Sequence, residues 1–150
     1  AIVFLFFFND NPLTLITRER QMKLLHYVLA LILLVSVPAV TAAPIENIAD
    51  APIGHKLNIE QIKKAVLLAG SGRGWQMKET ADGQVEAVLN IRKHQAIVRI
   101  DYNLNSYSIT YIDSTNLQAK NGQIHKNYNN WINNLNNDMK KYLQQYAYAG

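Results

Sequence analysis

The spacing of apolar side chains changes from about 3.6 residues to two between Trp75 and Leu117, and this change constrains the fold most. Apolar and polar residues alternate in a run that starts at Trp75 and in three later runs. The apolar members of the later runs are Val85, Ala87, Leu89 and Ile91, then Ala96, Val98, Ile100 and Tyr102, then Tyr107, Ile109 and Tyr111. Segments with turn chemistry separate the runs at 81–83, 92–95 and 103–105. The pattern predicts a four-stranded antiparallel meander with one apolar face, which another layer must cover.

A helix is expected before the meander, over residues 58–69. Its apolar residues recur at helical spacing: Ile59, Ile62, Val66 and Ala69. Asn58 is a good N-cap, and Gln61 three residues later completes a capping box. Gly70 is expected to end this helix in the left-handed conformation.

A long second helix is expected after the meander, in the stretch IHKNYNNWINNLNNDMKKYLQQY. Its apolar stripe consists of Ile124, Tyr128, Trp131, Leu135, Met139, Tyr142 and Tyr146, widened by Ile132 and Leu143. Asparagine is a poor helix former, so burial of this stripe must stabilise the helix. Asn121 or Asn127 is the expected N-cap, and a ligand groove lined by Tyr128 and Trp131 is the alternative to simple packing. We expect an α+β domain over residues 58–146, with both helices packed on the same face of the sheet.

The segment from Met22 has the three parts of a secretory signal peptide. A basic start at Lys23 is followed by an apolar run from Leu24 to Val37, then Pro38 and the small residues 39–43. The apolar run is shorter than the ~20 residues that a membrane-spanning helix needs, so a retained anchor is the weaker interpretation. We expect a signal peptide over residues 22–42, cleaved after Ala42 by the small-x-small rule.

Two segments, 1–21 and 43–57, flank the expected signal peptide. Residues 1–21 begin with alanine, and we expect them to be upstream sequence carried along by an over-long gene prediction. Residues 43–57 contain two prolines and no periodicity, which indicates a flexible lead or an edge segment.

Composition excludes several function classes. A formal net charge of +4 falls well short of a nucleic-acid-binding footprint, so no nucleic acid is expected as a partner. The chain has no cysteine, which rules out disulfides, thiol catalysis and a lipid-modified cysteine. The fold must therefore depend on its apolar core.

The polar face of the meander carries charges whose neighbours depend on strand register. The turns suggest one row of Lys78, Glu86, Asp101 and Ser108, and another of Gln76, Val88, Arg99 and Thr110. Glu86 would then face the like charge of Asp101, with Lys78 and Arg99 flanking the pair. This outer sheet face is either a plain charge cluster or a polar recognition patch.

Motifs for known chemistries are weak. The glycine-rich stretch 69–74 runs from helix into strand, the reverse of a phosphate loop, although Arg73 is available to an anionic partner. His55, His94 and His125 have no metal-ligand spacing, so neither a metal site nor a cofactor is expected. Ser71 or Ser114 could be combined with a histidine and Asp101 or Asp113, but there is no nucleophile elbow, and we assign no catalytic residue.

Four motifs in this chain carry a family resemblance: Gly74-Trp75, Ile100-x-Tyr102, Tyr107-Ser108-Ile109-x-Tyr111-x-x-Ser114-x-Asn116-Leu117, and Ile124-His125-x-Asn127-Tyr128-Asn129-x-Trp131-Ile132-x-Asn134-Leu135. Together they resemble a family of small, uncharacterised Gram-negative envelope proteins, many of which look like predicted lipoproteins. The resemblance spans about Leu57 to Leu143 and implies a location and a fold, but no reaction. The absence of cysteine from this chain favours a periplasmic product without a lipid anchor.

The motif residues suggest one site, at the junction of the fourth strand and the last helix. Its members are Tyr107, Tyr111, Ser114, Asn116, His125, Tyr128, Asn129 and Trp131. They either hydrogen-bond the strand end to the helix or form the rim of a pocket. An enzyme would need Ser114 within reach of a histidine in a cleft, whereas a binding module would show a shallow groove or an apolar patch around Val88, Ile97 and Ile112.

We therefore expect an exported periplasmic or secreted protein, a non-enzymatic binding or accessory protein of the cell envelope. Its partner would be an anionic envelope component or a protein, and its mature form would be a monomer or weak dimer without a transmembrane helix. The alternatives are a small hydrolase-like enzyme near Ser114 and His125, or a secreted inhibitor or interaction protein.

Overall fold

The computed structural model describes residues 12–33 and 41–149. The chain divides into two compact units, Ala1–Ala39 and Val40–Gly150. In the first unit, α1 (Pro12–Leu33) is one continuous helix that passes through Met22. Residues 1–11 of the expected upstream segment and residues 34–40 of the expected signal peptide lie outside the described residues. In the described ranges, no helix combines the length and apolar character needed to cross a membrane.

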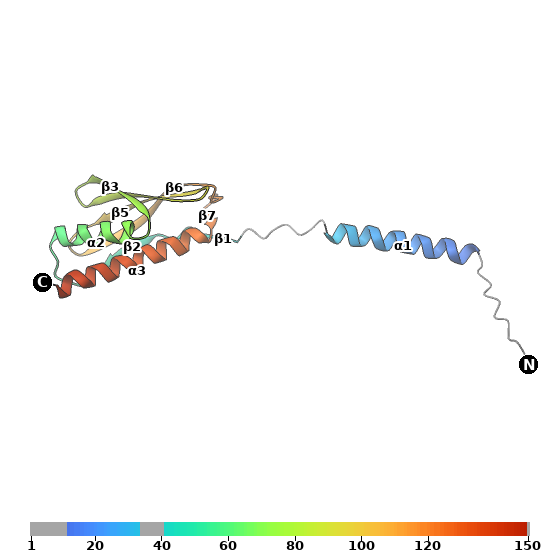
Figure 1. The fold of residues 1–150 in the computed structure, drawn as a ribbon, viewed down its shortest axis with the longest axis horizontal. Helices are drawn as coiled ribbons and strands as arrows, with labels where there is room; N and C mark the ends of the chain where they lie inside the picture. Colours follow the sequence, from blue (N-terminus) through green and yellow to red (C-terminus); the bar gives the residue numbers. More distant parts are fainter. Residues whose placement is uncertain (1–11, 34–40, 150) are drawn as a thin grey trace, which may run out of the picture. The chain divides into compact units, whose positions relative to one another are not determined.

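The second unit is an α+β domain built on antiparallel strands (Figure 1). Its elements in chain order are β1 (Ala42–Pro44), β2 (Ile48–Pro52), α2 (Ile59–Ser71), β3 (Trp75–Ala81), β4 (Gln84–Ile91), β5 (His94–Tyr102), β6 (Ser106–Thr115), β7 (Gln123–His125) and α3 (Asn127–Tyr148). Five strands form one sheet in the order β2-β6-β5-β4-β3, and β1 pairs with β7 in a second, two-stranded sheet.

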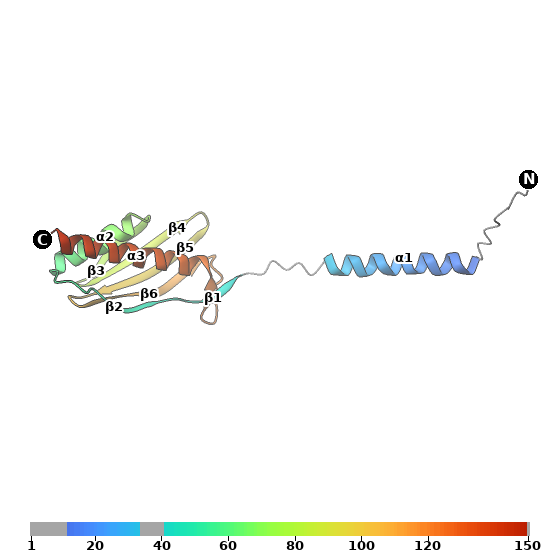
Figure 2. The ribbon, with the colours of Figure 1, turned by 90° about the horizontal axis from the view of Figure 1, so that it is seen from below.

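Both α2 and α3 lie on the same face of the five-stranded sheet, as expected (Figures 1 and 2). The core between the layers contains the inward residues of the alternating strands, such as Val85, Val98 and Ile109, all with no exposed surface. Leu135 and Met139 of α3 are buried in the same core. Burial of this face is the main favourable term that stabilises the domain.

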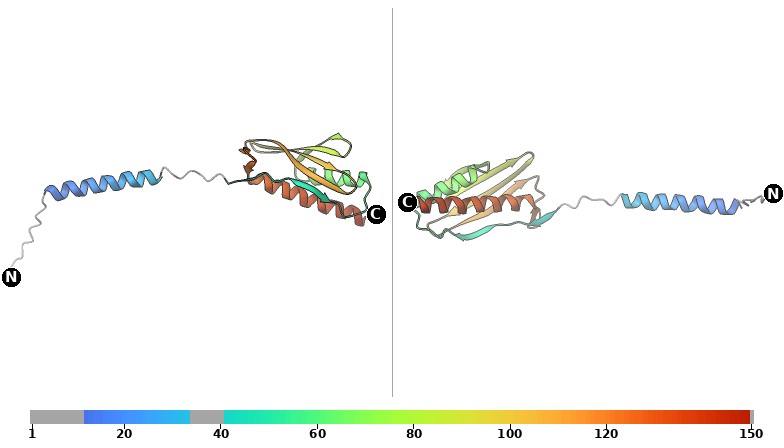
Figure 3. Two further views of the ribbon diagram at one scale, coloured as in Figure 1. Left: turned by 180° about the vertical axis from the view of Figure 1, so that it is seen from behind. Right: turned by 60° about the horizontal axis from the view of Figure 1, so that its bottom comes forward.

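The sheet has one strand more than the predicted meander. β2, from the segment 43–57, adds to the edge of β6 through Ile48↔Ile109 and Ala51↔Tyr107, so of the two interpretations of this segment the structure has the edge strand. A register shift lies between Ile48 and Ala51, and Asp50 there has a positive φ of 45°. The right-hand view of Figure 3 shows β2 along the side of the sheet away from β3. A short, bulged strand that ends in proline gives no clean alternation in sequence.

The expected register is wrong between β4 and β5 and right for the other two pairs of the meander. Lys78 faces Glu86, and Asp101 faces Ser108, but Glu86 faces Arg99 instead of Asp101. The reason is the turn, which contains only Arg92 and Lys93, because Ile91 already pairs with His94. Arg92 takes a φ of 55°, the left-handed conformation of a tight two-residue hairpin. The predicted like-charge contact is therefore replaced by an opposite-charge pair.

The first helix begins as predicted and ends later. The capping box is present: Asn58 Oδ1 accepts from Gln61 N, and Gln61 Oε1 accepts from Asn58 N, both at 2.9 Å. Gly70 lies inside α2, where a Cβ would collide with the Met77 side chain, so the prediction that Gly70 ends the helix is wrong. The left-handed residue is Gly74, with a φ of 81°.

Arg73 in the same loop is committed to an internal ion pair. Its Nε and Nη2 donate to the two carboxylate oxygens of Asp138 on α3, at 2.6 and 3.2 Å. The hydrogen bond from Arg73 lowers the pKa of Asp138. The side chain that seemed available to an anionic partner therefore ties the α2–β3 loop to α3.

The last helix starts later than expected. Ile124 lies in β7 rather than in the helix, though it is fully buried, and α3 begins at Asn127 after Lys126. Neither Asn121 nor Asn127 is the N-cap, because Lys126 occupies that position without a side-chain capping bond. The asparagines 127, 130, 134 and 137 are exposed, on the solvent side of α3.

Substitution of Gly54 and Gly83 measures two free-energy costs separately: that of a side chain in a left-handed backbone and that of a steric contact. Gly54 and Gly83 have nearly equal φ, 71° and 72°, but a Cβ at Gly83 would lie 2.6 Å from Tyr102 O, whereas one at Gly54 meets nothing within 4 Å. We expect Gly54→Ala to lower the free energy of unfolding by about 1 kcal/mol, and Gly83→Ala to lower it by a further ~1–3 kcal/mol through overpacking. Urea denaturation followed by circular dichroism measures both. Equal losses for the two variants would contradict the predicted contact.

Candidate functional site

The residues predicted at the strand–helix junction make contacts in separate small groups. Tyr107, near the start of β6, is 1% exposed, and its hydroxyl donates to Asn136 Oδ1 on α3 at 2.6 Å. Burial raises the pKa of Tyr107 to about 12. Asn136 did not stand out in the sequence, because asparagines occur on every side of this helix. The pair joins the sheet to α3 inside the core.

Tyr111, Ser114 and Tyr128 form the second group. A β-bulge in β6 places one extra residue, Ile112, in the pairing with β5, so that Tyr111 pairs with the inward Val98 and Ser114 with the inward Ala96. The Tyr111 hydroxyl and Ser114 Oγ are 2.8 Å apart. The Tyr111 ring meets the Tyr128 ring edge to face, with centroids 5.4 Å apart and an 88° angle between planes.

Among the described junction residues, Tyr128 is the one whose buried side-chain polar atom is unsatisfied. It is fully buried, and its hydroxyl is without a hydrogen-bond partner in the described residues. Burial raises its pKa, and Tyr111 and Glu46 raise it further, so this hydroxyl keeps its proton. A buried hydroxyl of this kind is where an ordered water or a ligand oxygen would be expected.

Asn129 and Asn133 of α3 hold the segment that leads into β2. Asn129 Nδ2 donates to Pro44 O at 2.8 Å, and Asn129 Oδ1 accepts from Glu46 N at 3.2 Å. Asn133 Nδ2 donates to Glu46 Oε2 at 2.8 Å. We call residues 44–47 the N-terminal strap. It is bound at a third point, where Tyr111 N donates to Asn47 Oδ1 at 2.8 Å.

The other junction residues lie apart from these groups. Asn116 Nδ2 donates to Lys93 O at 2.6 Å, and Asn116 O is 2.8 Å from His94 Nδ1. His125 Nδ1 accepts from Asn127 N at 3.2 Å, at the start of α3. Trp131 is only partly buried and packs against the core. The contacts of the predicted site are thus mainly internal ones between elements.

The hydroxyl of Ser114 is not paired with a histidine, as nucleophilic catalysis would require. Its hydroxyl is paired with Tyr111, while His94 and His125 are engaged with Asn116 and Asn127. The ring centroids of His55 and Tyr148 are 6.4 Å apart. In residues 12–33 and 41–149, no group of three or more His, Cys, Asp or Glu could hold a metal ion.

The outer sheet face carries the four predicted charges in a new arrangement. Arg99 Nε donates to Asp101 Oδ2 at 2.8 Å, and Gln84 Nε2 donates to the other carboxylate oxygen at 2.8 Å. Glu86 lies between Lys78 and Arg99 across the strands. Val88 and Ile97 of the expected apolar patch are direct partners, and Ile112 is 45% exposed at the bulge.

A groove that the sequence analysis did not identify lies at the end of the sheet where β6 begins. It has a volume of about 800 Å³ and is lined by Lys56, Leu57, Asn58, Ile59, Asp82, Gly83, Tyr102, Asn103 and Leu104. A second hollow of about 360 Å³ shares four of these residues and adds Glu60, Lys63 and Glu79. Lys63 is paired there with Glu60 and Glu79, at 3.2 and 3.7 Å. This end groove is within the size range of small-molecule sites.

Strand order explains why the groove residues come together. In an antiparallel meander alternate turns lie at the same end, so the β3–β4 turn meets the β5–β6 turn. The N-terminus of α2 reaches the same end, which adds Leu57 and Ile59. Ile59 and Leu104 are 42% and 56% exposed, so the groove presents apolar surface to solvent.

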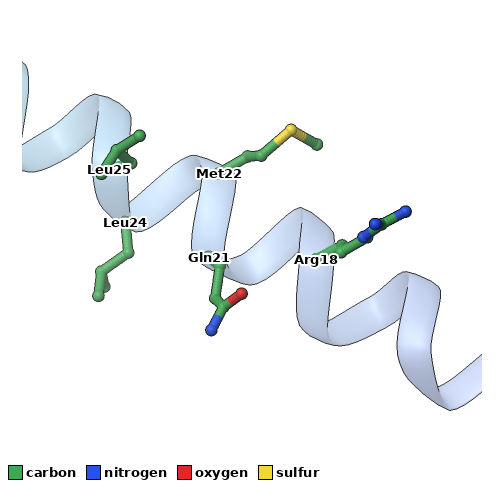
Figure 4. Close-up of a pocket in the computed structure, with 5 residues that line it drawn as sticks. All are labelled: Arg18, Gln21, Met22, Leu24 and Leu25. Carbon is green, nitrogen blue, oxygen red and sulfur yellow. The ribbon is translucent and has the colours of Figure 1, made fainter.

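A further hollow, on α1, is not a site. It is lined by Arg18, Gln21, Met22, Leu24 and Leu25, all from one helix. Figure 4 shows these side chains pointing away from the ribbon in several directions. The hollow is the space between neighbouring side chains on a convex surface.

Comparisons with known proteins give no family for this chain. No family model, curated protein or solved structure matches it. The resemblance to envelope proteins therefore stays a prediction, and the groove and contacts above are the basis for a functional proposal.

Removal of the Tyr107 hydroxyl tests the buried link to α3. We expect Tyr107→Phe to lower the free energy of unfolding by ~1–3 kcal/mol, because Asn136 Oδ1 would lose its donor in a buried place. Tyr148→Phe, at a residue that is 79% exposed, is the matched control and should change little. Chemical denaturation at pH 7 measures both, and an unchanged Tyr107→Phe variant would contradict the prediction.

The same tyrosine predicts an alkaline limit to stability. Its pKa is about 12 in the folded chain against 10.0 for the unperturbed group, so the folded state resists loss of this proton. The contribution of Tyr107 is therefore fully present below pH 10 and is lost as pH rises from 10 to 12. We expect the unfolding free energy to fall over this window, and to fall less steeply in Tyr107→Phe. Parallel slopes for the two proteins would contradict the assignment to Tyr107.

The end groove predicts a local preference for apolar probes. We expect Leu104→Asn to weaken binding of 1-anilinonaphthalene-8-sulfonate by roughly threefold or more, because the probe would lose apolar contact worth ~1 kcal/mol. Ile91→Asn is the control, since Ile91 is 37% exposed and does not line the groove. Fluorescence titration measures both. An equal loss in the two variants would show that the probe binds elsewhere.

Proposed function

We propose that this chain is an exported, non-enzymatic binding or accessory protein of a Gram-negative cell envelope. The observation that carries the proposal is where the compact domain starts. The first strand of the domain, β1, begins at Ala42, one residue before the Ala43 that the signal-peptide pattern makes the first residue of the mature protein. A removable leader followed at once by an independent domain is what an exported protein requires.

The contacts at the junction favour binding over catalysis. Ser114 and the histidines are occupied by other partners, which gives no support to the hydrolase-like alternative. The end groove is the proposed contact surface, because it combines exposed Leu104 and Ile59 with Lys56 and Asp82, whose charges would orient a ligand. The outer sheet face around Val88, Ile97 and Ile112 is the second candidate surface, and would suit a weak dimer.

Processing of the whole chain in a Gram-negative host tests the export step. We expect a periplasmic product whose N-terminal residue is Ala43. Ala42→Trp should block processing, because the site requires a small residue at this position, whereas Thr41→Gln should be processed normally. Cell fractionation and N-terminal sequencing give the result. An unprocessed wild-type chain in the cytoplasm would overturn the proposal.

A further inference from the structure

The bond that signal removal would break lies inside a hydrogen-bonded strand of the folded domain. Ala42 and Ala43 are the first two residues of β1, and they pair with His125 and Ile124 of β7. On one side of the bond Lys126 N donates to Thr41 O at 3.1 Å, and on the other Ile45 N donates to Gly122 O at 2.9 Å. The Ala42–Ala43 peptide is therefore held between two fixed points.

The strand is reinforced beyond its own short length. Three residue pairs are few for a two-stranded sheet, which by itself is marginally stable in water. Asn129 adds two hydrogen bonds, one to Pro44 O at the end of β1 and one from Glu46 N just after it, and it is only 7% exposed. Asn133 adds a third to the Glu46 carboxylate. Opening of β1 must therefore break contacts with both β7 and α3.

We propose that docking of β1 and the strap closes the cleavage site, so that signal removal is confined to the chain before this docking. The inference rests on the proposed export of the chain. Peptidases bind their substrate backbone in an extended and unpaired form, and they attack folded chains through locally opened states. In the reaction, water adds across the Ala42–Ala43 peptide bond, leaving a carboxylate on Ala42 and an ammonium group on Ala43.

The cleaved chain keeps most of what holds β1. Ala43 and Pro44 still face Ile124 and Gln123, and the strap bonds to Asn129 involve only residues after the cut. Cleavage removes the Ala42–His125 pair and the Thr41 acceptor. The same contacts of β1 and the strap with β7 and α3 would thus block the cleavage site in the uncut precursor and stabilise the mature domain.

The test uses the full 150-residue chain and a purified bacterial signal peptidase in detergent. Folded precursor and urea-unfolded precursor, diluted into the assay, are compared for the rate at which the Ala43 N-terminus appears. We expect the folded chain to be cut at least tenfold more slowly. Asn129→Ala, which removes the two hydrogen bonds of Asn129 to the strap, should recover much of this rate in the folded state. Asn134→Ala, the same change at an exposed position of α3, should behave like the wild type.

Each outcome decides a separate point. Equal rates for folded and unfolded wild type would overturn this inference and leave the export proposal intact. Cleavage of neither form would overturn the export proposal and the inference with it. If Asn129→Ala does not fold, amide exchange of Ala43 and Ile45 in the wild type replaces it. Exchange of these two amides at unprotected rates would overturn the inference.

Discussion

The domain depends on the contact between the apolar face of the sheet and α3. This helix is rich in asparagine, which favours turns and caps over helix interiors, so its own propensity cannot hold it. Tyr128, Ile132, Leu135, Met139 and Leu143 are all buried against the sheet. In turn, α3 is the longer of the two helices that cover the inward face of the strands. Each layer is therefore stable only in the presence of the other, which predicts cooperative folding of the whole unit.

The asparagines of α3 have a second role that follows from this packing. Once the apolar stripe fixes the rotation of the helix, Asn129 and Asn133 are directed at the strap and Asn136 at Tyr107. Amide side chains donate and accept at once, so Asn129 alone satisfies both a carbonyl and an N–H of the passing chain. A helix chosen for propensity, rich in alanine or leucine, would bury its face equally well but could not clamp the N-terminal strap.

The sequence predicted the elements whose pattern is local and missed those whose partners are distant. Alternation placed Val85, Val98 and Ile109 inward, and the Asn58–Gln61 box marked the start of α2 correctly. The β4–β5 register was wrong because turn length depends on the φ of Arg92, which residue type does not fix. The end groove was not predicted from the sequence, because its lining comes from three separate segments, each of which looks like an ordinary turn or cap.

The positions of the strap and its partners along the chain affect when the strap can dock. The strap is synthesised before the rest of the domain, but its partner Asn129 lies 83 residues after Glu46. Closing so long a loop costs entropy, which only the finished core can offset. We therefore expect the strap to dock late, after α3 has packed on the sheet. Under the proposed export, the Ala42–Ala43 bond would until then stay in an unpaired chain next to the expected signal peptide. A domain that closed its N-terminus through neighbouring residues, as in a hairpin, would hide this bond early and compete with the proposed processing. Contact with the last helix would delay the closure instead.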